Sequence, residues 1–303
     1  MHISAPVTYA TGSIPPFWAR FPKFFLFPLQ SEPLIYMGLL TALEVVCVFV
    51  AVFAAGIGIA AVGDDPRHLL RGGVTFTLLL MLAIIAVPWL AFFRYAYKVL
   101  EQTARGRLTL AQYQQFSTAE AASRPYKQLA VFLLFGLFEG LALQNFGEIA
   151  FLVAHGLVLL GLPATVMIIA IDNSVWRAVN PFATLSIMSS LGWAYFALWG
   201  CLLLLSVANA GVVFFVVAKL PPLPAFVAAN LVSMYFTLVG FNLLGYTLYQ
   251  FHQQLGLDVD VDFSRQTQFS PEMPKPADPI GETIGALIAQ GDIERALTLA
   301  YDD

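Results

Sequence analysis

The stretch VFLLFGLFEGLALQNFGEIAFLVAHGLVL, residues 131–159, lies inside a longer apolar run that covers residues 129–171. A membrane-spanning helix needs roughly 20 apolar residues, so this run is too long for one span and suits two. The polar segment QNFGE in its middle favours a tight turn. The run therefore predicts two spans, at 129–144 and 149–171.

Similar apolar runs recur along the chain of 303 residues, which is 59% hydrophobic and only 11% charged. A soluble domain is typically about 25% charged and no more than half apolar, so the excess apolar surface indicates a lipid environment. The other predicted spans cover residues 34–62, 74–97, 193–217 and 226–251. The predicted fold is an all-α polytopic bundle of about six spans, at residues 34–251.

The charges of the chain predict its orientation. With six spans, one side of the membrane receives twelve of the fifteen Lys and Arg residues and the other side only three. Loops rich in Lys and Arg stay in the cytoplasm, so we expect both termini there, in a bacterial inner membrane.

Three segments flank the predicted bundle. Residues 1–33 are rich in proline and aromatic residues, which favours either a short interfacial segment or a lid packed against the bundle. Residues 252–278 are acidic and contain proline, as linkers do. Residues 279–303 resemble one tetratricopeptide-like helical hairpin, which cannot bury its apolar faces alone. The tail would either dock to a protein partner or be a frayed, only partly folded helical tail. The docking candidates are Ile284, Leu287, Ile293 and Leu297.

Four ionisable residues lie within or beside the predicted spans: Glu44, Glu139, Glu148 and His155. Placing an ionisable group inside a membrane span costs roughly 2.5–3.5 kcal/mol, so such a residue is a candidate for a functional role. Glu44, Glu139 and His155 would face one interior and pass protons or bind a cation. The alternatives are a ligand-binding role and interhelical hydrogen bonding, while Glu148 would reach water beside the turn.

Small residues at helix surfaces permit close packing, and the predicted spans contain several glycines. The segment GLFEG places Gly136 and Gly140 around Glu139, and Gly200 and Gly240 lie in later spans. The sequence leaves open whether several copies of the chain associate through these glycine-containing helix surfaces, here called glycine seams.

Six basic residues near the predicted cytoplasmic surface are candidates for contacting anionic lipid headgroups. They are Arg94, Lys98, Arg105, Arg107, Arg124 and Lys127. The alternative is that these residues only determine the topology.

Motifs of catalysis or metal binding are missing from the sequence. It contains no HExxH, GxSxG or Walker motif and no Cys/His cluster, and Cys47 and Cys201 both lie in apolar runs. The acidic C-terminal region, with ten acids against three bases after residue 251, argues against nucleic acid as a partner. We expect no enzyme activity, cofactor or metal site.

Three blocks carry a family resemblance: LPATVMIIAIDNSVWRAVNP at 162–181, GWAYFAL at 192–198 and GYTLYQFHQQLGLDVD at 245–260. They resemble bacterial multi-pass membrane families of uncharacterised function, similar in layout to Yip-type proteins and to glycerophosphodiester phosphodiesterase membrane domains. The resemblance implies a helical bundle with cytoplasmic ends and carries over no catalytic residue.

The Asn-Pro elbow within the first block also has a physical interpretation. Asn180 would cap a new helix and Pro181 would occupy its first turn. Arg177 would pair with Asp172.

The sequence favours a binding, scaffold or accessory protein that contacts the bilayer and organises membrane partners through its C-terminal tail. The alternative is a proton- or cation-coupled transporter or channel that uses the intramembrane glutamates and histidine.

Overall fold

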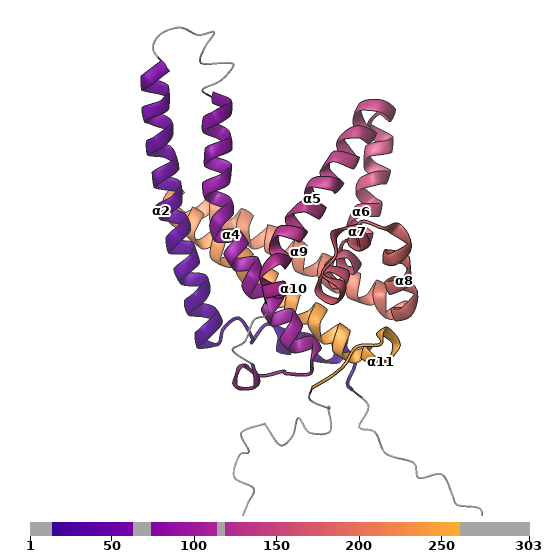
Figure 1. The fold of residues 1–303 in the computed structure, drawn as a ribbon. Helices are drawn as coiled ribbons and strands as arrows, with labels where there is room; N and C mark the ends of the chain where they lie inside the picture. The colour runs from indigo at the N-terminus through magenta and orange to yellow at the C-terminus, as the bar shows by residue number, and fades with distance from the viewer. Residues whose placement is uncertain (1–13, 63–73, 114–118, 261–303) are drawn as a thin grey trace, which may run out of the picture. The chain divides into compact units, whose positions relative to one another are not determined.

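The computed structural model describes residues 14–62, 74–113 and 119–260, and its regular elements in these ranges are all helical (Figure 1). The chain divides into two compact units, Met1–Phe263 and Ser264–Asp303, and every described residue belongs to the first. The long helices are α2 (Ser31–Val62), α4 (Val74–Ala104), α5 (Ala119–Phe146), α6 (Glu148–Asp172), α9 (Trp193–Lys219) and α10 (Pro222–Gln250). The short elements are η1 (Phe17–Arg20), α1 (Phe21–Phe24), η3 (Leu110–Gln112), α7 (Val175–Ala178), α8 (Pro181–Leu191) and α11 (His252–Leu255).

Five stretches of helix are long and apolar enough to cross a membrane, among the residues whose side chains are described. They are Ser31–Phe53 of α2, Ala122–Phe146 of α5, and the whole of α6, α9 and α10. The prediction of an all-helical membrane protein is thereby confirmed. Helix α4 coincides with the predicted span at 74–97, which is not among these five stretches, and continues beyond it to Ala104. The count of six spans stays a prediction.

The predicted turn between the two central spans lies where the QNFGE segment placed it. Helix α5 ends at Phe146, α6 begins at Glu148, and Gly147 between them has φ +83°. This left-handed backbone conformation suits glycine, which has no Cβ. Helix α5 begins ten residues earlier than the span predicted at 129–144.

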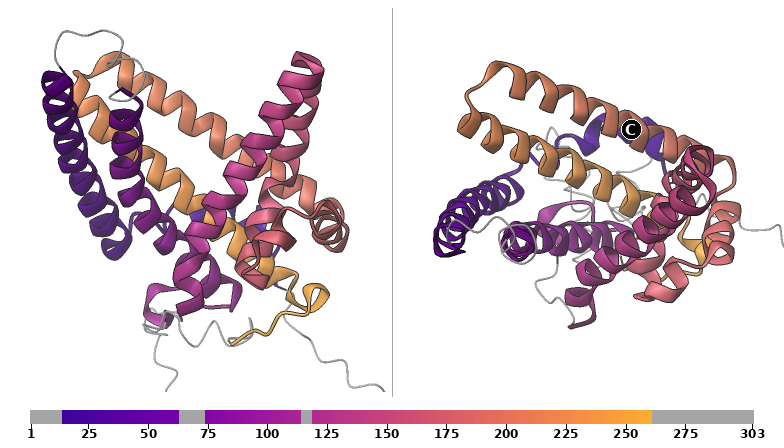
Figure 2. Two further views of the ribbon diagram at one scale, coloured as in Figure 1. Left: turned by 45° about the horizontal axis from the view of Figure 1, so that its top comes forward. Right: turned by 90° about the horizontal axis from the view of Figure 1, so that it is seen from above.

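The long helices associate in antiparallel pairs. Helix α2 packs against α4, α5 against α6, and α9 against α10, and the most extensive contact between pairs joins α4 to α10. Figure 2 shows α9 and α10 running side by side in both views. Helix α10 is therefore the central element of the described unit.

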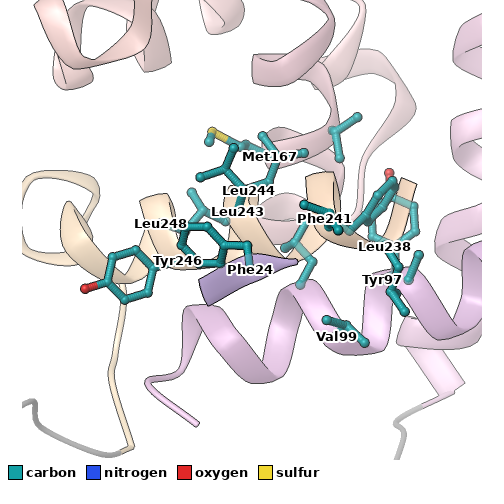
Figure 3. Packing of buried hydrophobic residues seen from close by; sticks show 14 of the residues in the cluster. Phe24, Tyr97, Val99, Met167, Leu238, Phe241, Leu243, Leu244, Tyr246 and Leu248 are labelled. Carbon is teal, nitrogen blue, oxygen red and sulfur yellow. The ribbon is translucent and has the colours of Figure 1, made fainter. Parts of the chain in front are cut away.

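The second half of α10 forms the centre of the core. Its residues from Leu238 to Tyr249 are all buried, and they contact α4 on one side and α6 on another (Figure 3). A Cβ added at Gly245 would lie 2.5 Å from the backbone oxygen of Leu100. Only glycine permits α4 and α10 to approach this closely.

The N-terminal segment packs against the C-terminal end of α10, as the lid interpretation expected. The Phe17 backbone amide donates a hydrogen bond to Gln250 Oε1 at 2.9 Å, and the Tyr246 hydroxyl donates one to the Pro15 carbonyl at 2.8 Å. The aromatic residues Phe17, Phe24 and Phe27 are buried. Trp18, Leu26 and Leu29 are more than half exposed, so the outer face of the segment is apolar.

The elbow after α6 has the predicted contacts. The Asn180 side chain accepts a hydrogen bond from the Phe182 amide at 3.0 Å, and Pro181 is the first residue of α8. Arg177 donates to Asp172 Oδ1 at 2.7 Å. The expected cap and ion pair are both confirmed.

Candidate functional site

Glu44 is buried at the contact between α2 and α4. Its side chain accepts a hydrogen bond from Trp89 Nε1 at 3.2 Å, and the residue is 2% exposed. Its other carboxyl oxygen, Oε2, has no hydrogen-bond partner among the described residues. Glu44 thus links two neighbouring helices.

Glu139 and His155 form a second polar contact, between α5 and α6. His155 Nδ1 lies 3.1 Å from Glu139 Oε1, and the Phe151 ring stacks on the imidazole with centroids 5.7 Å apart. The His155 side chain is 46% exposed and that of Glu139 is 17% exposed. The predicted proximity of these two residues is confirmed.

The predicted cluster of Glu44, Glu139 and His155 does not form. Glu44 bonds within the α2–α4 pair, whereas Glu139 and His155 bond within the α5–α6 pair. Helical periodicity could not show this, because it does not state which helices are neighbours. Glu148 is exposed at the first position of α6, beside the turn, as expected.

The glycine seam lies elsewhere than the sequence indicated. A Cβ added at Gly136, Gly140 or Gly200 would meet nothing within 4 Å, and one at Gly240 would make an ordinary contact with Leu202. The close approach is at Gly245, which the sequence analysis did not single out. The GLFEG segment does not form a packing seam with the described residues.

Two of the basic residues proposed for lipid headgroups are buried in contacts with the protein itself. The Arg107 side chain is 7% exposed and donates to Gln102 Oε1 and to Asp260 Oδ2, both at 2.7 Å. The Arg124 side chain is 9% exposed and pairs with Glu101. For these two residues the headgroup interpretation is wrong, because burial keeps the guanidinium groups away from lipid.

The remaining four basic candidates are more accessible. Arg105 pairs with Glu101 at 2.9 Å, and Lys127 donates to the Asn173 carbonyl at 2.6 Å. Arg94 and Lys98 form no ion pair with any residue of the described part of the chain. These last two retain the headgroup interpretation.

Asp260 anchors the beginning of the acidic segment, which the sequence analysis treated as a linker. Its carboxylate contacts Arg107, and its backbone amide donates to the Arg105 carbonyl at 3.0 Å. The segment is thus held against the end of α4 as far as residue 260. Residues 261–278 and the docking candidates Ile284, Leu287, Ile293 and Leu297 lie outside the described residues.

A cavity of about 310 Å³ lies between α4, α5, α6, α9 and α10. Most of its lining is aliphatic or aromatic, and the polar lining side chains, apart from the Trp199 indole, are Gln128, Ser206, Asn209 and Thr237. None of the described residues that line it is acidic, basic or a histidine.

Two of the residues that line the cavity each have a buried polar atom without a hydrogen-bond partner among the described residues: Gln128 Nε2, a donor, and Asn209 Oδ1, an acceptor. Gln128 Oε1 is occupied, because it accepts a hydrogen bond from the Tyr97 hydroxyl at 2.6 Å. The sequence analysis missed both amides. An isolated Asn in the middle of the 193–217 apolar run was the signal that could have found one of them.

Comparisons with protein-family models, with curated proteins and with solved structures find no match to this chain. The resemblance to Yip-type and phosphodiesterase membrane-domain layouts therefore stays a prediction. Among the described residues, no group of three or more His, Cys, Asp or Glu side chains could hold a metal ion. The features that remain for functional interpretation are the two separate polar contacts, the exposed helix faces and the internal cavity.

Proposed function

We propose that this protein is an integral membrane protein that binds and organises other membrane components. The proposal includes six spans, with α4 as the second, both termini in the cytoplasm of a bacterial cell, and a C-terminal docking tail. One observation carries it: Glu44 bonds to Trp89 within the α2–α4 pair, whereas Glu139 and His155 bond to each other within the α5–α6 pair.

A proton or cation path needs polar groups that follow one another across the membrane. Glu44 and the Glu139–His155 contact lie in different helix pairs, and none of these residues lines the cavity inside the bundle. Polar side chains that bond across neighbouring helices hold those helices together. This role accounts for all three residues without transport.

The exposed faces of α5 and α9 support a binding role. The buried share of the most apolar stretch is 11% in α5 and 6% in α9. The corresponding share is 44% in both α6 and α10. Phe214 on α9 is 78% exposed. Such faces can contact lipid chains or the membrane helices of a partner.

Proteoliposomes would separate this proposal from the transporter alternative. The purified full chain is reconstituted with an internal pH-sensitive dye, and a proton, sodium or potassium gradient is imposed. We expect the same flux as in empty liposomes for the wild type and for Glu139→Gln. A pH-dependent flux that Glu139→Gln abolishes would contradict the proposal and support the transporter.

Site-specific photocrosslinking in native membranes would test the binding role directly. A benzophenone amino acid replaces Phe214 in one variant and the buried Phe241, 7% exposed, in the control. We expect a discrete protein adduct from position 214 alone, either with a second copy or with another membrane protein. Adducts with lipid only, at both positions, would overturn the binding role.

A further inference from the structure

We propose that the cavity between α4, α5, α6, α9 and α10 binds an uncharged long-chain lipid with a hydroxyl headgroup. This inference goes beyond the organising role proposed above, because it concerns a small molecule inside the bundle. It stands on the composition of the cavity lining and on two buried polar atoms.

The polar atoms define what the headgroup must offer. Gln128 Nε2 needs an acceptor, and Asn209 Oδ1 needs a donor. A buried polar group without a hydrogen bond is costly, so a ligand that satisfies these atoms gains affinity. A hydroxyl group both donates and accepts, so hydroxyl-bearing ligands can satisfy either atom.

A hydrogen bond to Oε1 holds the Gln128 amide in position. Gln128 is 2% exposed, and its Oε1 accepts the hydrogen bond from Tyr97, which is 1% exposed. This contact leaves Nε2 as the amide atom without a partner among the described residues, on a side chain that lines the cavity. The site is thus built from buried side chains of α4 and α5.

The rest of the lining excludes a charged headgroup and favours a hydrocarbon chain. Side chains such as Phe93, Phe132, Leu162 and Val166 surround the space, and no ionised side chain is among them. An ion without a counter-charge in such surroundings is strongly disfavoured. A volume of about 310 Å³ lies at the lower end of the pocket sizes that hold small molecules.

The bilayer is the natural source of such a ligand. Helix α9 forms one wall of the cavity, and its most apolar stretch is the least buried among the five candidate spans of the described residues. A molecule already dissolved in the lipid can therefore approach this wall without passing through water.

Photoaffinity labelling of the full chain in phosphatidylcholine nanodiscs would test the proposal. The probe is hexadecanol with a diazirine in its chain, and the comparator is hexadecanoic acid with the same diazirine. We expect saturable labelling of cavity residues by the alcohol, competed by unlabelled hexadecanol and not by hexadecanoic acid. Equal competition by the two compounds, or labelling confined to exposed residues such as Phe214, would overturn the proposal.

Substitutions of Asn209 and Gln128 would test whether each of these side chains contacts the hydroxyl group of the ligand. Asn209→Leu and Gln128→Leu should each raise the half-competing concentration of hexadecanol about fivefold or more, as loss of a hydrogen bond of ordinary strength does. Ser206→Ala is the matched control, because Ser206 also lines the cavity and its hydroxyl already donates a hydrogen bond to the Leu202 carbonyl at 2.9 Å. We expect its effect to be less than about twofold.

A third variant fills the space itself. Gly240 lines the cavity, and Gly240→Leu should abolish saturable labelling while the chain stays monodisperse. If Gln128→Leu does not fold, Asn209→Leu and Gly240→Leu decide the question. Wild-type labelling in both of them would show that the cavity holds no such lipid.

Discussion

Replacing Gly245 by alanine should force α4 and α10 apart. The added Cβ would lie 2.5 Å from the Leu100 carbonyl oxygen, 2.9 Å from Thr103 Cβ and 3.0 Å from Leu100 Cα. An ordinary contact begins near 3.4 Å, so the two backbones must separate by about 0.9 Å. Because two of the three contacts are with backbone atoms, no side-chain rotation can relieve them.

Gly240→Ala provides a matched control on the same helix. Its Cβ would lie 3.5 Å from Leu202 Cδ2, which is an ordinary contact. Both variants gain about 1 kcal/mol of helix propensity, and this gain cancels when they are compared. Overpacking costs about 1–3 kcal/mol, so Gly245→Ala should be less stable than Gly240→Ala by this amount.

Equilibrium unfolding in mixed dodecyl maltoside and dodecyl sulfate micelles, followed by circular dichroism, would measure the difference. If the two variants had the same free energy of unfolding within about 0.5 kcal/mol, the close approach of α4 and α10 would be refuted. A Gly240→Ala variant that lost as much stability as Gly245→Ala would also refute the close approach.

Three further predictions concern the contacts that hold the described unit together. Phe17→Ala should lower the free energy of unfolding by about 3–5 kcal/mol, because Phe17 is fully buried. Leu26→Ala, at a position 62% exposed, should lower it by less than about 1 kcal/mol. Equal losses in the two variants would contradict the packing of the N-terminal segment. A double-mutant cycle of Glu44→Leu and Trp89→Phe should show a coupling energy of about 0.6–1.7 kcal/mol in the same unfolding assay, and additive effects would remove the proposed link between α2 and α4. Asp260→Ala removes one of the two partners of the buried Arg107 guanidinium and should lower the free energy of unfolding by about 1–2 kcal/mol. It should also speed limited proteolysis after residue 255. Unchanged proteolysis would exclude the anchoring contact.

The helices themselves could be predicted because their signal is local. Apolar length identified each long helix, and the QNFGE segment located the turn at Gly147. The Asn180 cap and the Arg177–Asp172 pair were also predictable, since both join residues within five positions of each other.

The contacts between distant residues were predicted poorly. The sequence analysis treated Asp260 as part of a solvated linker, yet it pairs with Arg107, 153 positions earlier. It placed Glu44 in a cluster with Glu139 and His155, yet Glu44 bonds to Trp89. Neither partner is encoded by spacing or periodicity, because both depend on which segments of the chain become neighbours.

The sequence by itself determined that this chain forms long apolar helices, because in lipid every backbone amide must be satisfied within its own segment. Only the tertiary structure decided which faces of those helices meet. The close approach at Gly245 follows from that choice, and so do the two atoms without partners among the described residues, Gln128 Nε2 and Asn209 Oδ1. Lipid chains and apolar side chains are alike to an apolar helix face, so hydrophobicity does not select a neighbour, and shape and hydrogen bonds do.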